Sequence, residues 1–486
     1  VAGCQPAPRK LVIFHTNDIH GHFVPEIVKS GSDSVRMGGM VALYDHLDSL
    51  RKLYPHSLYL DAGDLMTGNP ICNLVYRGVE GGALLEMLNR CGIAAMTIGN
   101  HEFDRGAEHL RQFIAAAPYP VINANVEEKS DHRPIAIPTQ VFQSNGLKIG
   151  VIGLLMNHLA GSVSKSSIEP FTMLDAATTA QKYIDQLDPE TDVIVLLTHM
   201  GVEEDSLLAT QVHHADIIVG GHSHTRLEKP LEVNDVLIVQ AGAYCKNLGL
   251  LEVTIAADSV SDYTGQLIPL IPSSTPKPSA VKSLADSIDA VIQQQYGQVI
   301  GELKSAWNPS YFSGSNVGNW ICDRLRARYH ADVALVNAGG IRTSVAAGPI
   351  TMLKILELLP FQNSVVTFNA TGRDLEKMAN EQARAQALQK HGALEMSGMT
   401  IDYTVKNGDA QAIKVTIGDK PLEMERVYRV VSIDYVAMGQ WDRYLAFEPD
   451  SIETTGGLLS DIIMDEIRAS TQPITADAAT RLVEVH

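Results

Sequence analysis

The sequence predicts a protein with two α/β domains joined by a linker. A chain of 486 residues is too long for one hydrophobic core of ordinary size, so two domains are expected. Short apolar runs typical of strands alternate with longer stretches of helical periodicity, the pattern of α/β domains with parallel or mixed sheets. A proline-dense segment at residues 269–278 separates the two halves, so we place the linker there.

The first domain is expected over residues 10–270, after an N-terminal tether of residues 1–9. Apolar runs predict strands at residues 11–14, 57–60, 94–98, 193–197 and 217–219. Apolar residues at helical spacing predict helices at residues 40–53, 80–90, 107–116 and 174–187. Because the helices are interleaved with the strands, they are expected to cover the sheet.

The linker region, residues 271–296, ends in one long helix from residue 279, and the second domain follows at residues 297–486. One stripe of this linker helix is apolar: Val281, Leu284, Ala285, Ile288, Val291 and Ile292. In the second domain we predict helices at residues 316–329, 352–359 and 372–389. Its strands are predicted at residues 333–337, 365–368, 399–405 and 428–433.

The composition limits the class of partner. Hydrophobic residues make up 45% of the chain and charged residues 19%, which is typical of a folded globular protein. The net charge of −18 argues against a nucleic-acid polymer as partner, because such partners require a basic face. A small phosphorylated substrate needs only a local positive centre, which metal ions can supply.

The five cysteines show no CxxC pair, so no cysteine-built zinc site is expected, and buried or free thiols are the simplest interpretation. No apolar run reaches the roughly 18 residues that a membrane span requires. Residues 1–4 are similar to the end of a bacterial lipoprotein signal, which makes Cys4 a candidate for lipidation. A chance tetrapeptide is the alternative.

Five short segments of the first half are rich in metal-ligand side chains: residues 18–20, 61–64, 99–102, 198–199 and 220–224. Most of them follow a predicted strand, and strand ends in an α/β sheet are where ligands collect. Carboxylate, imidazole and amide oxygen are ligands of hard or borderline divalent metals. The sequence therefore predicts one dinuclear metal site.

Asp64 is the candidate bridging ligand, because it lies just past a strand in a glycine-containing loop. Asp18 and His20 are two residues apart, so in an extended segment they point to the same side and bind the first metal with His224. The second metal is assigned to the remaining candidates, Asn100, His199 and His222.

His101 is adjacent to Asn100 and is expected to face the substrate instead, with Asp104 orienting its imidazole. A cationic histidine there would stabilise charge developing on a phosphoryl group. Taken singly, each residue has a simpler explanation: Asp64 could cap a helix and Asn100 could form a turn. The five clusters together favour the metal site.

Three motifs of the first domain resemble those of the 5'-nucleotidase family of calcineurin-like metallophosphoesterases, bacterial type: HTNDIHG at 15–21, GNHEFD at 99–104 and GGHSH at 220–224. Three more resemble its C-terminal substrate-binding domain: NVGN at 316–319, NAGGIR at 337–342 and PFQN at 360–363. The resemblance extends over residues 11–459. It implies a four-layer α/β/β/α catalytic domain and a nucleotide-binding second domain.

The resemblance also implies a reaction and its cofactors. Two divalent ions, Zn, Mn or Co, would activate water to attack the phosphate of a nucleoside 5'-phosphate. The implied ligands are Asp18, His20, Asp64 and His224 for one ion, and Asp64, Asn100, His199 and His222 for the other, with His101 and Asp104 as the catalytic dyad. The small-molecule nucleotide is the implied partner, in the cell envelope, periplasm or extracellular space.

In the second domain the resemblance implies that the base stacks between two aromatic rings. Phe361 corresponds to the first ring, and the implied polar contacts are Asn337, Gly340, Arg342 and Asn363. Base and metal sites on different domains would require rotation about residues 269–296.

Two departures from the family pattern concern this substrate site. Residues 309–315, PSYFSGS, lack the usual arginine, and residues 438–444, MGQWDRY, replace the usual Gly-Gly-Asp-Gly-aromatic motif. Tyr444 or Trp441 is then the candidate second ring, Asp442 the acidic residue, and Arg443 the replacement positive charge. A different substrate is the alternative: a UDP-sugar, a 2',3'-cyclic nucleotide or a thiosulfate ester. A non-catalytic nucleotide-binding envelope protein is the non-enzyme alternative.

Overall fold

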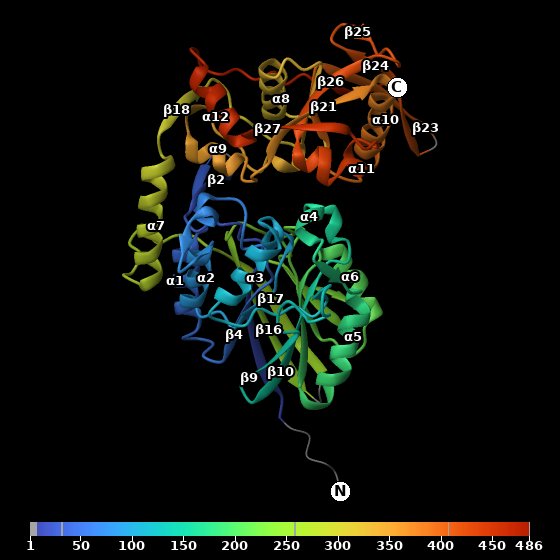
Figure 1. Cartoon of the computed structure of the whole chain (residues 1–486). Coiled ribbons are helices and arrows are strands. Elements are labelled where there is room, and N and C mark those ends of the chain that lie inside the picture. The colour runs from blue at the N-terminus through green and yellow to red at the C-terminus, as the bar shows by residue number, and fades with distance from the viewer. Residues whose placement is uncertain (1–6, 31–32, 257–258, 407, 486) are drawn as a thin grey trace. The chain divides into compact units, whose positions relative to one another are not determined.

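The structure, a computed structural model, describes residues 7–30, 33–256, 259–406 and 408–485 (Figure 1). The chain divides into two compact units, residues 1–291 and 292–486. The division falls inside the helix α7 (Ala280–Tyr296), which follows the proline-dense segment. The predicted domain limits at residues 270 and 297 remain predictions.

The first unit contains a five-stranded sheet in the order β17-β16-β1-β4-β7. Its strands are β17 (Ser259–Pro269), β16 (Asn247–Ala256), β1 (Arg9–Thr16), β4 (Ser57–Asp61) and β7 (Ala95–Met96). The strand β1 lies between an antiparallel neighbour, β16, and a parallel one, β4. The sheet is therefore mixed, as the sequence predicts.

A second, six-stranded sheet has the order β14-β15-β13-β12-β10-β9. Its strands are β14 (Leu231–Val233), β15 (Val236–Val239), β13 (Ile217–Val219), β12 (Val193–His199), β10 (Leu147–Leu155) and β9 (Thr139–Ser144). Three two-stranded ribbons complete the unit: β2 (Glu26–Ser30) with β3 (Asp33–Met37), β5 (Val75–Tyr76) with β6 (Val79–Glu80), and β8 (Val126–Glu128) with β11 (Phe171–Met173).

The two large sheets of the first unit pack on each other through alternate side chains. Leu11 and Ile13 of one sheet share a fully buried apolar cluster with Val195 and Leu197 of the other. The period of two along each strand leaves the other side chains, such as Phe14, for the opposite face.

Helices flank the two sheets of this unit (Figure 1). They are α1 (Met40–Leu50), α2 (Gly82–Arg90), α3 (Gly106–Ala116), α4 (Lys165–Ile168), α5 (Ala176–Leu187) and α6 (Val202–Gln211). The helix α5 contacts β10, and α6 contacts β15. This arrangement confirms the predicted four-layer α/β/β/α domain.

The second unit is also α/β, with a five-stranded sheet in the order β22-β19-β26-β21-β27. Its strands are β22 (Leu394–Ser397), β19 (Val333–Asn337), β26 (Val427–Ile433), β21 (Ser364–Thr371) and β27 (Asp450–Leu458). A four-stranded sheet contains β25 (Lys420–Pro421), β24 (Asp409–Ile417), β23 (Met399–Lys406) and β28 (Leu482–Glu484), and a ribbon pairs β18 (Val299–Leu303) with β20 (Gly348–Thr351).

The helices of the second unit are α8 (Asn316–Arg328), α9 (Met352–Leu358), α10 (Gly372–Leu388), α11 (Trp441–Tyr444) and α12 (Leu459–Ala469). Side-chain caps fix where several of them begin. Ser315 accepts a hydrogen bond from the Gly318 amide at the start of α8, and Thr371 and Asp374 form a capping box on α10. The helices predicted from the sequence at these places are confirmed.

Two further predictions concern cysteines and membranes. Cys4, the predicted lipidation site, lies outside the described residues, and the other four cysteines are buried free thiols. Among the described residues, each helix is either too short or too polar to cross a bilayer.

Candidate metal centre

The candidate ligands follow the carboxyl ends of strands in both sheets of the first unit. The strands β1 and β4 are parallel and end side by side, so the loops that carry Asp18 and Asp64 start together. In the other sheet, β12 is parallel to β13 and ends at His199, while His222 lies in the loop that follows β13. Both sheets therefore deliver polar side chains from equivalent strand ends.

The backbone at these ligands is unusual. Five candidates have a left-handed conformation, with φ of 51° at Asp18, 51° at His20, 56° at Asp64, 76° at His222 and 54° at His224. The extended segment predicted for Asp18 and His20 is therefore wrong. Such φ values are uncommon outside glycine and cost about 1–3 kcal/mol each. Backbone hydrogen bonds from Asp18 to Gly63 (2.8 Å) and from His20 to Asp64 (2.9 Å) hold the two loops in this shape.

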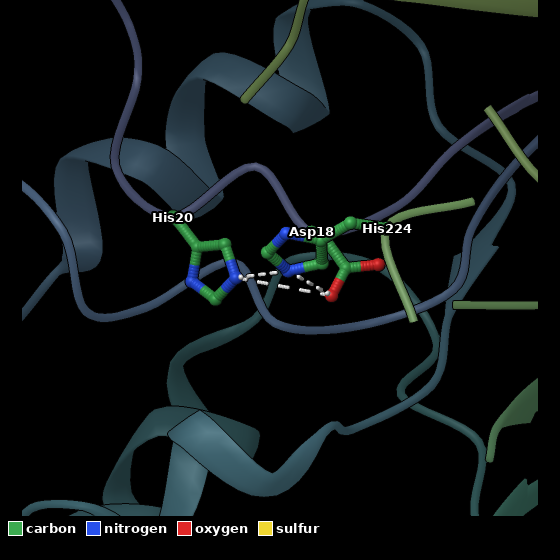
Figure 2. Close-up of side chains that lie close together, drawn as sticks. All are labelled: Asp18, His20 and His224. Atoms are coloured by element: carbon green, nitrogen blue, oxygen red, sulfur yellow. Dashed lines mark hydrogen bonds and ion pairs between the residues drawn. The ribbon is translucent and has the colours of Figure 1, made fainter. Parts of the chain in front are cut away.

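The ligand atoms converge despite the unexpected backbone. Asp18, His20 and His224 form one group, whose ligand atoms all lie within 4.8 Å of one another (Figure 2). The Nε2 atom of His224 lies 3.2 Å from Asp18 Oδ1 and 3.1 Å from His20 Nε2. Two imidazole nitrogens and a carboxylate facing one point are the arrangement of a divalent-metal site.

A second group of the same compactness contains Asp64, His199 and His222. Asp64 Oδ2 lies 3.1 Å from His199 Nε2 and 3.8 Å from His20 Nε2, so this carboxylate faces ligands of both groups. Asn100, the remaining candidate, lies 2.9 Å from His222 through its Oδ1 atom. The positions of all seven candidates are consistent with a pair of ions and a shared Asp64.

The Nδ1 atoms of His20 and His199 point away from the metal-ligand cluster and lie close to backbone carbonyls, so the Nε2 atoms face the cluster. His20 Nδ1 faces the carbonyls of Met66 (3.0 Å) and Thr67 (2.9 Å), and His199 Nδ1 faces that of Ala62 (2.7 Å). A neutral imidazole that donates from Nδ1 presents a lone pair at Nε2. The inward Nε2 atoms are thus prepared to bind a cation.

Two buried polar atoms of the cluster support the same conclusion. Among the described residues, Asp18 Oδ1 and His199 Nε2 make no hydrogen bond and face only other ligands of the cluster, His224 at 3.2 Å and Asp64 at 3.1 Å. Buried polar atoms without a partner are costly and rare in folded proteins. The donor set and these two atoms fit bound divalent ions.

The charges of the cluster shift its pKa values in opposite directions. Burial lowers the pKa of His222 to about 4, and the charge of His199 adds to this. Burial also disfavours the charged form of His199, but Asp64 and Asp18 outweigh it and raise the pKa to about 10, so a cation that binds at Nε2 would replace a proton there. Burial disfavours ionised Asp18 as well, yet its histidine neighbours bring the pKa down to about 2. Asp18 is therefore held as a carboxylate, the form that binds a cation.

His101 and Asp104 form the predicted pair. His101 Nδ1 lies 2.7 Å from Asp104 Oδ2, and the Thr67 hydroxyl donates to the same oxygen at 2.7 Å. The other ring nitrogen, Nε2, lies 3.9 Å from Asp64 Oδ2, so the imidazole faces the metal cluster from one side. The carboxylate fixes the ring orientation, as in histidines that transfer or hold a proton.

Glu102 is a residue of this centre whose role the sequence does not reveal. It is buried, and its carboxylate accepts hydrogen bonds from the backbone amides of Gly99 (2.6 Å), Leu65 (2.9 Å), Asp64 (3.1 Å) and Met66 (3.1 Å). One side chain thus ties the Asp64 loop to the loop of Asn100. In the sequence, Glu102 is recognisable only as an acidic residue within the motif at 99–104, which also contains the candidate metal ligand Asn100.

Asn17 and Asp61 are two further supports to which sequence analysis assigned no role, although Asp61 begins the ligand-rich segment 61–64. Asn17 donates to Asp18 Oδ2 (2.6 Å) and to the Gly242 carbonyl (2.6 Å), which orients the Asp18 carboxylate. Asp61 accepts from the Thr16 hydroxyl (2.6 Å), and burial raises its pKa to about 8. Both residues are buried beneath the ligand loops.

The second unit brings together some of the predicted substrate residues. The Arg342 guanidinium lies 5.9 Å from the centre of the Phe361 ring, so these two residues are adjacent. Gly340 lies next to Asn337, because a Cβ at Gly340 would be 3.1 Å from Asn337 Oδ1. The Asn363 carbonyl accepts from the amide of Leu459 (2.9 Å).

The segment of Tyr444 forms another group in the second unit. Tyr444 is buried, is hydrogen-bonded to the Asn337 side chain, and has a pKa raised to about 12 by burial. The Arg443 guanidinium lies 5.8 Å from its ring. Asp442 is exposed on the short helix α11. The roles of these residues in substrate binding stay predictions.

Comparison with known proteins agrees with both halves of the chain. Residues 11–226 match the family calcineurin-like phosphoesterase, and residues 297–448 match the 5'-nucleotidase, C-terminal domain. The 5'-nucleotidase of Diplobatis ommata is 28% identical over 90% of this chain and 83% of its own length. The human 5'-nucleotidase is 27% identical over 88% of this chain and 83% of its own length.

Solved structures give the same result. A 5'-nucleotidase precursor from Thermus thermophilus superposes with a TM-score of 0.85 at 28% identity, covering 98% of this chain and 99% of that one. A sulfate thiohydrolase superposes with a TM-score of 0.82 over 98% of this chain and 96% of that one, but at 17% identity it shows the shared fold alone. With both domain matches in the expected order, the chain belongs to the 5'-nucleotidase family of calcineurin-like phosphoesterases.

Proposed function

We propose that this protein is a metal-dependent phosphomonoesterase that hydrolyses nucleoside 5'-phosphates to nucleoside and phosphate. The convergence of seven ligand side chains in the first unit carries the proposal. The relatives named 5'-nucleotidase, which align with most of this chain, support the choice of substrate. No specific contact among the described residues favours a UDP-sugar, a cyclic nucleotide or a thiosulfate ester.

The metal-binding residues are assigned in two sets. Asp18, His20, Asp64 and His224 would hold one divalent ion, and Asp64 would hold the second ion with Asn100, His199 and His222. When bound, such ions stabilise negative charge on a phosphoryl group and make water acidic enough to supply a nucleophile near neutral pH. Nitrogen and oxygen donors suit Zn, Mn or Co.

His101 and Asp104 are proposed to act on the substrate as a pair. Asp104 accepts from His101 Nδ1, which favours the protonated imidazole and leaves Nε2 directed at the cluster. A positive imidazole in that position stabilises the phosphoryl oxygens as charge develops on them. Because Thr67 also donates to Asp104, the carboxylate cannot rotate away without losing two hydrogen bonds.

The nucleoside is proposed to bind to the second unit. Phe361 offers an aromatic face to the base, and Arg342 beside it offers positive charge. Asn337, Gly340 and Asn363 would make polar contacts, with Asp442, Arg443 and Tyr444 contributed by the altered motif. Arg443 compensates for the arginine that residues 309–315 lack.

A location in the cell envelope, either periplasmic or extracellular, is also proposed. It is supported by the solved relative titled a 5'-nucleotidase precursor and by the sequence around Cys4. Metabolic labelling with a fatty acid, compared between the wild type and Cys4→Ala, tests the lipid anchor. Label that persists in the variant would contradict it.

The substrate proposal is tested by phosphate release after chelation and re-addition of Mn²⁺, Zn²⁺ or Co²⁺. The panel contains AMP, GMP, UMP, ADP, ATP, UDP-glucose, 2',3'-cyclic AMP and 4-nitrophenyl phosphate. Metal-dependent hydrolysis that is fastest for the 5'-monophosphates is the expected result. Preference for UDP-glucose or the cyclic nucleotide, or hydrolysis of 4-nitrophenyl phosphate alone, would contradict it.

A further inference from the structure

The backbone at Tyr244 is strained. Its φ is 63°, and the next residue, Cys245, is also left-handed, with φ of 51°. A bulky residue in this conformation is an outlier, and such outliers cluster at functional sites because the surrounding structure must impose them. Here the Tyr244 amide donates to the Asp18 carbonyl at 2.7 Å, which holds the turn against the loop of a candidate metal ligand. The strained turn therefore brings an aromatic side chain to the metal centre.

The Tyr244 ring packs on the imidazoles of two candidate ligands of the first ion, the one assigned to residues 18, 20, 64 and 224. Its centroid lies 5.3 Å from that of His224 at an interplanar angle of 82°, an edge-to-face contact. It lies 5.7 Å from that of His20 at an angle of 45°. One ring thus contacts both imidazoles of this ligand set.

An ion-paired cluster also contacts the Tyr244 ring. The ring of His22 lies with its centroid 4.6 Å away, and Lys246 Nζ lies 5.0 Å from the ring centre, within range of a cation–π contact. Both residues pair with the Glu26 carboxylate, Lys246 at 3.1 Å. Because these neighbours are tied to one another, the Tyr244 ring is held in place before any metal binds.

The His224 ring is held differently from those of His20 and His199. The latter two place Nδ1 against backbone carbonyls, as described above. In the described part of the chain, His224 Nδ1 makes no hydrogen bond, and its Nε2 faces only other ligands. Imidazoles that bind metal usually need a partner outside the ligand set to fix the ring orientation. For His224 the edge-to-face contact with Tyr244 takes the place of that hydrogen bond.

We propose that Tyr244 is a positioning residue for the first ion, because its ring holds His224 in the orientation that directs Nε2 toward Asp18 (Figure 2). The inference rests on the proposed function, since it concerns how the proposed metal centre is assembled. The packing of the ring performs this role, and the phenol hydroxyl does not. Phenylalanine should therefore replace Tyr244, whereas a side chain without a ring should not.

Calorimetric titration of the metal-free protein with Co²⁺ tests the inference. Tyr244→Asn removes the ring but suits the backbone, because asparagine tolerates the left-handed region. It is expected to weaken the binding of one of the two ions about tenfold or more, the loss typical of removing a residue that orients a metal ligand. Tyr244→Leu, which keeps apolar bulk without a ring, is expected to show the same loss. Tyr244→Phe is expected to bind both ions as the wild type does.

The visible absorption spectrum of the Co²⁺-loaded protein gives a second readout, because it depends on the number and geometry of the ligands and not on the stability of the fold. At saturating Co²⁺, Tyr244→Asn is expected to have an altered spectrum and Tyr244→Phe the wild-type spectrum. Tyr183→Asn, which removes a half-buried tyrosine ring from α5, is the matched control. It should keep both the affinity and the spectrum of the wild type, because α5 carries no candidate ligand.

Wild-type Co²⁺ affinity and an unchanged spectrum in Tyr244→Asn would overturn this inference and leave the proposed function intact. An equal loss of affinity in Tyr244→Phe and Tyr244→Asn would also overturn it, since the hydroxyl would then be responsible. A wild type that binds no Co²⁺ would overturn both the inference and the proposed function.

Discussion

Replacing Glu102 with glutamine tests how the fold holds the two ligand loops together. Each carboxylate oxygen accepts two backbone amides: Oε1 those of Leu65 and Met66, and Oε2 those of Asp64 and Gly99. Glutamine keeps one acceptor oxygen but turns its NH₂ group toward the other two amides. Two lost hydrogen bonds to a charged group, at about 1.5 kcal/mol each, lower the free energy of unfolding by about 3 kcal/mol.

Thermal unfolding of the metal-free protein should then show a Tm about 6 °C lower for Glu102→Gln, at about 2 °C per kcal/mol. Metal affinity, measured by calorimetry, should fall as well, because Glu102 fixes the loops that carry Asp64 and Asn100. Glu108→Gln, an exposed glutamate on α3, is the matched control and should leave both quantities unchanged. Wild-type Tm and metal affinity in Glu102→Gln would refute this reasoning.

Three further predictions follow from particular contacts. Asp104→Asn should lower kcat for AMP by about 10²-fold or more while keeping bound metal, because only the orientation and charge of His101 change; metal loss in elemental analysis would contradict this. Gly99→Ala should abolish metal binding, since the new Cβ would lie 2.1 Å from Asp64 Oδ1; calorimetry that finds wild-type affinity would refute it. Burial raises the pKa of Glu395 from 4.5 to about 7, so the folded chain keeps a proton that the unfolded chain releases. Stability should therefore fall as the pH rises from 4.5 to 7, and Tm measured across this range should fall less in Glu395→Gln; parallel Tm curves would argue against it.

Most elements of the fold are predictable because their sequence patterns are local. The apolar runs that become β1, β12 and β19 and the periodic stretch that becomes α10 correspond closely to the elements observed. The strand β10 is not recognisable from its pattern, because Gly150 and Gly153 interrupt its apolar run. Gly153 is required by a neighbour distant in sequence, since a Cβ there would lie 2.0 Å from the Ile122 carbonyl oxygen.

The candidate site is predictable in its residues but not in its backbone. Strand ends rich in aspartate and histidine indicate the ligand set, because few other functions require those side chains together. The left-handed backbone at Asp18 and His20 has no sequence signal, since tertiary hydrogen bonds impose it on residues that rarely adopt it.

The most direct test of the dinuclear phosphoesterase centre is the metal content of the purified protein, measured alongside AMP hydrolysis, for the wild type and Asp64→Ala. We expect two divalent ions per wild-type chain, and loss of both metal and hydrolysis in Asp64→Ala, because Asp64 faces both groups of ligands. Val427→Ala, which shortens an exposed side chain of the second unit, is the control and should match the wild type. Full hydrolysis by Asp64→Ala, or AMP hydrolysis that survives complete removal of metal, would contradict the central claim.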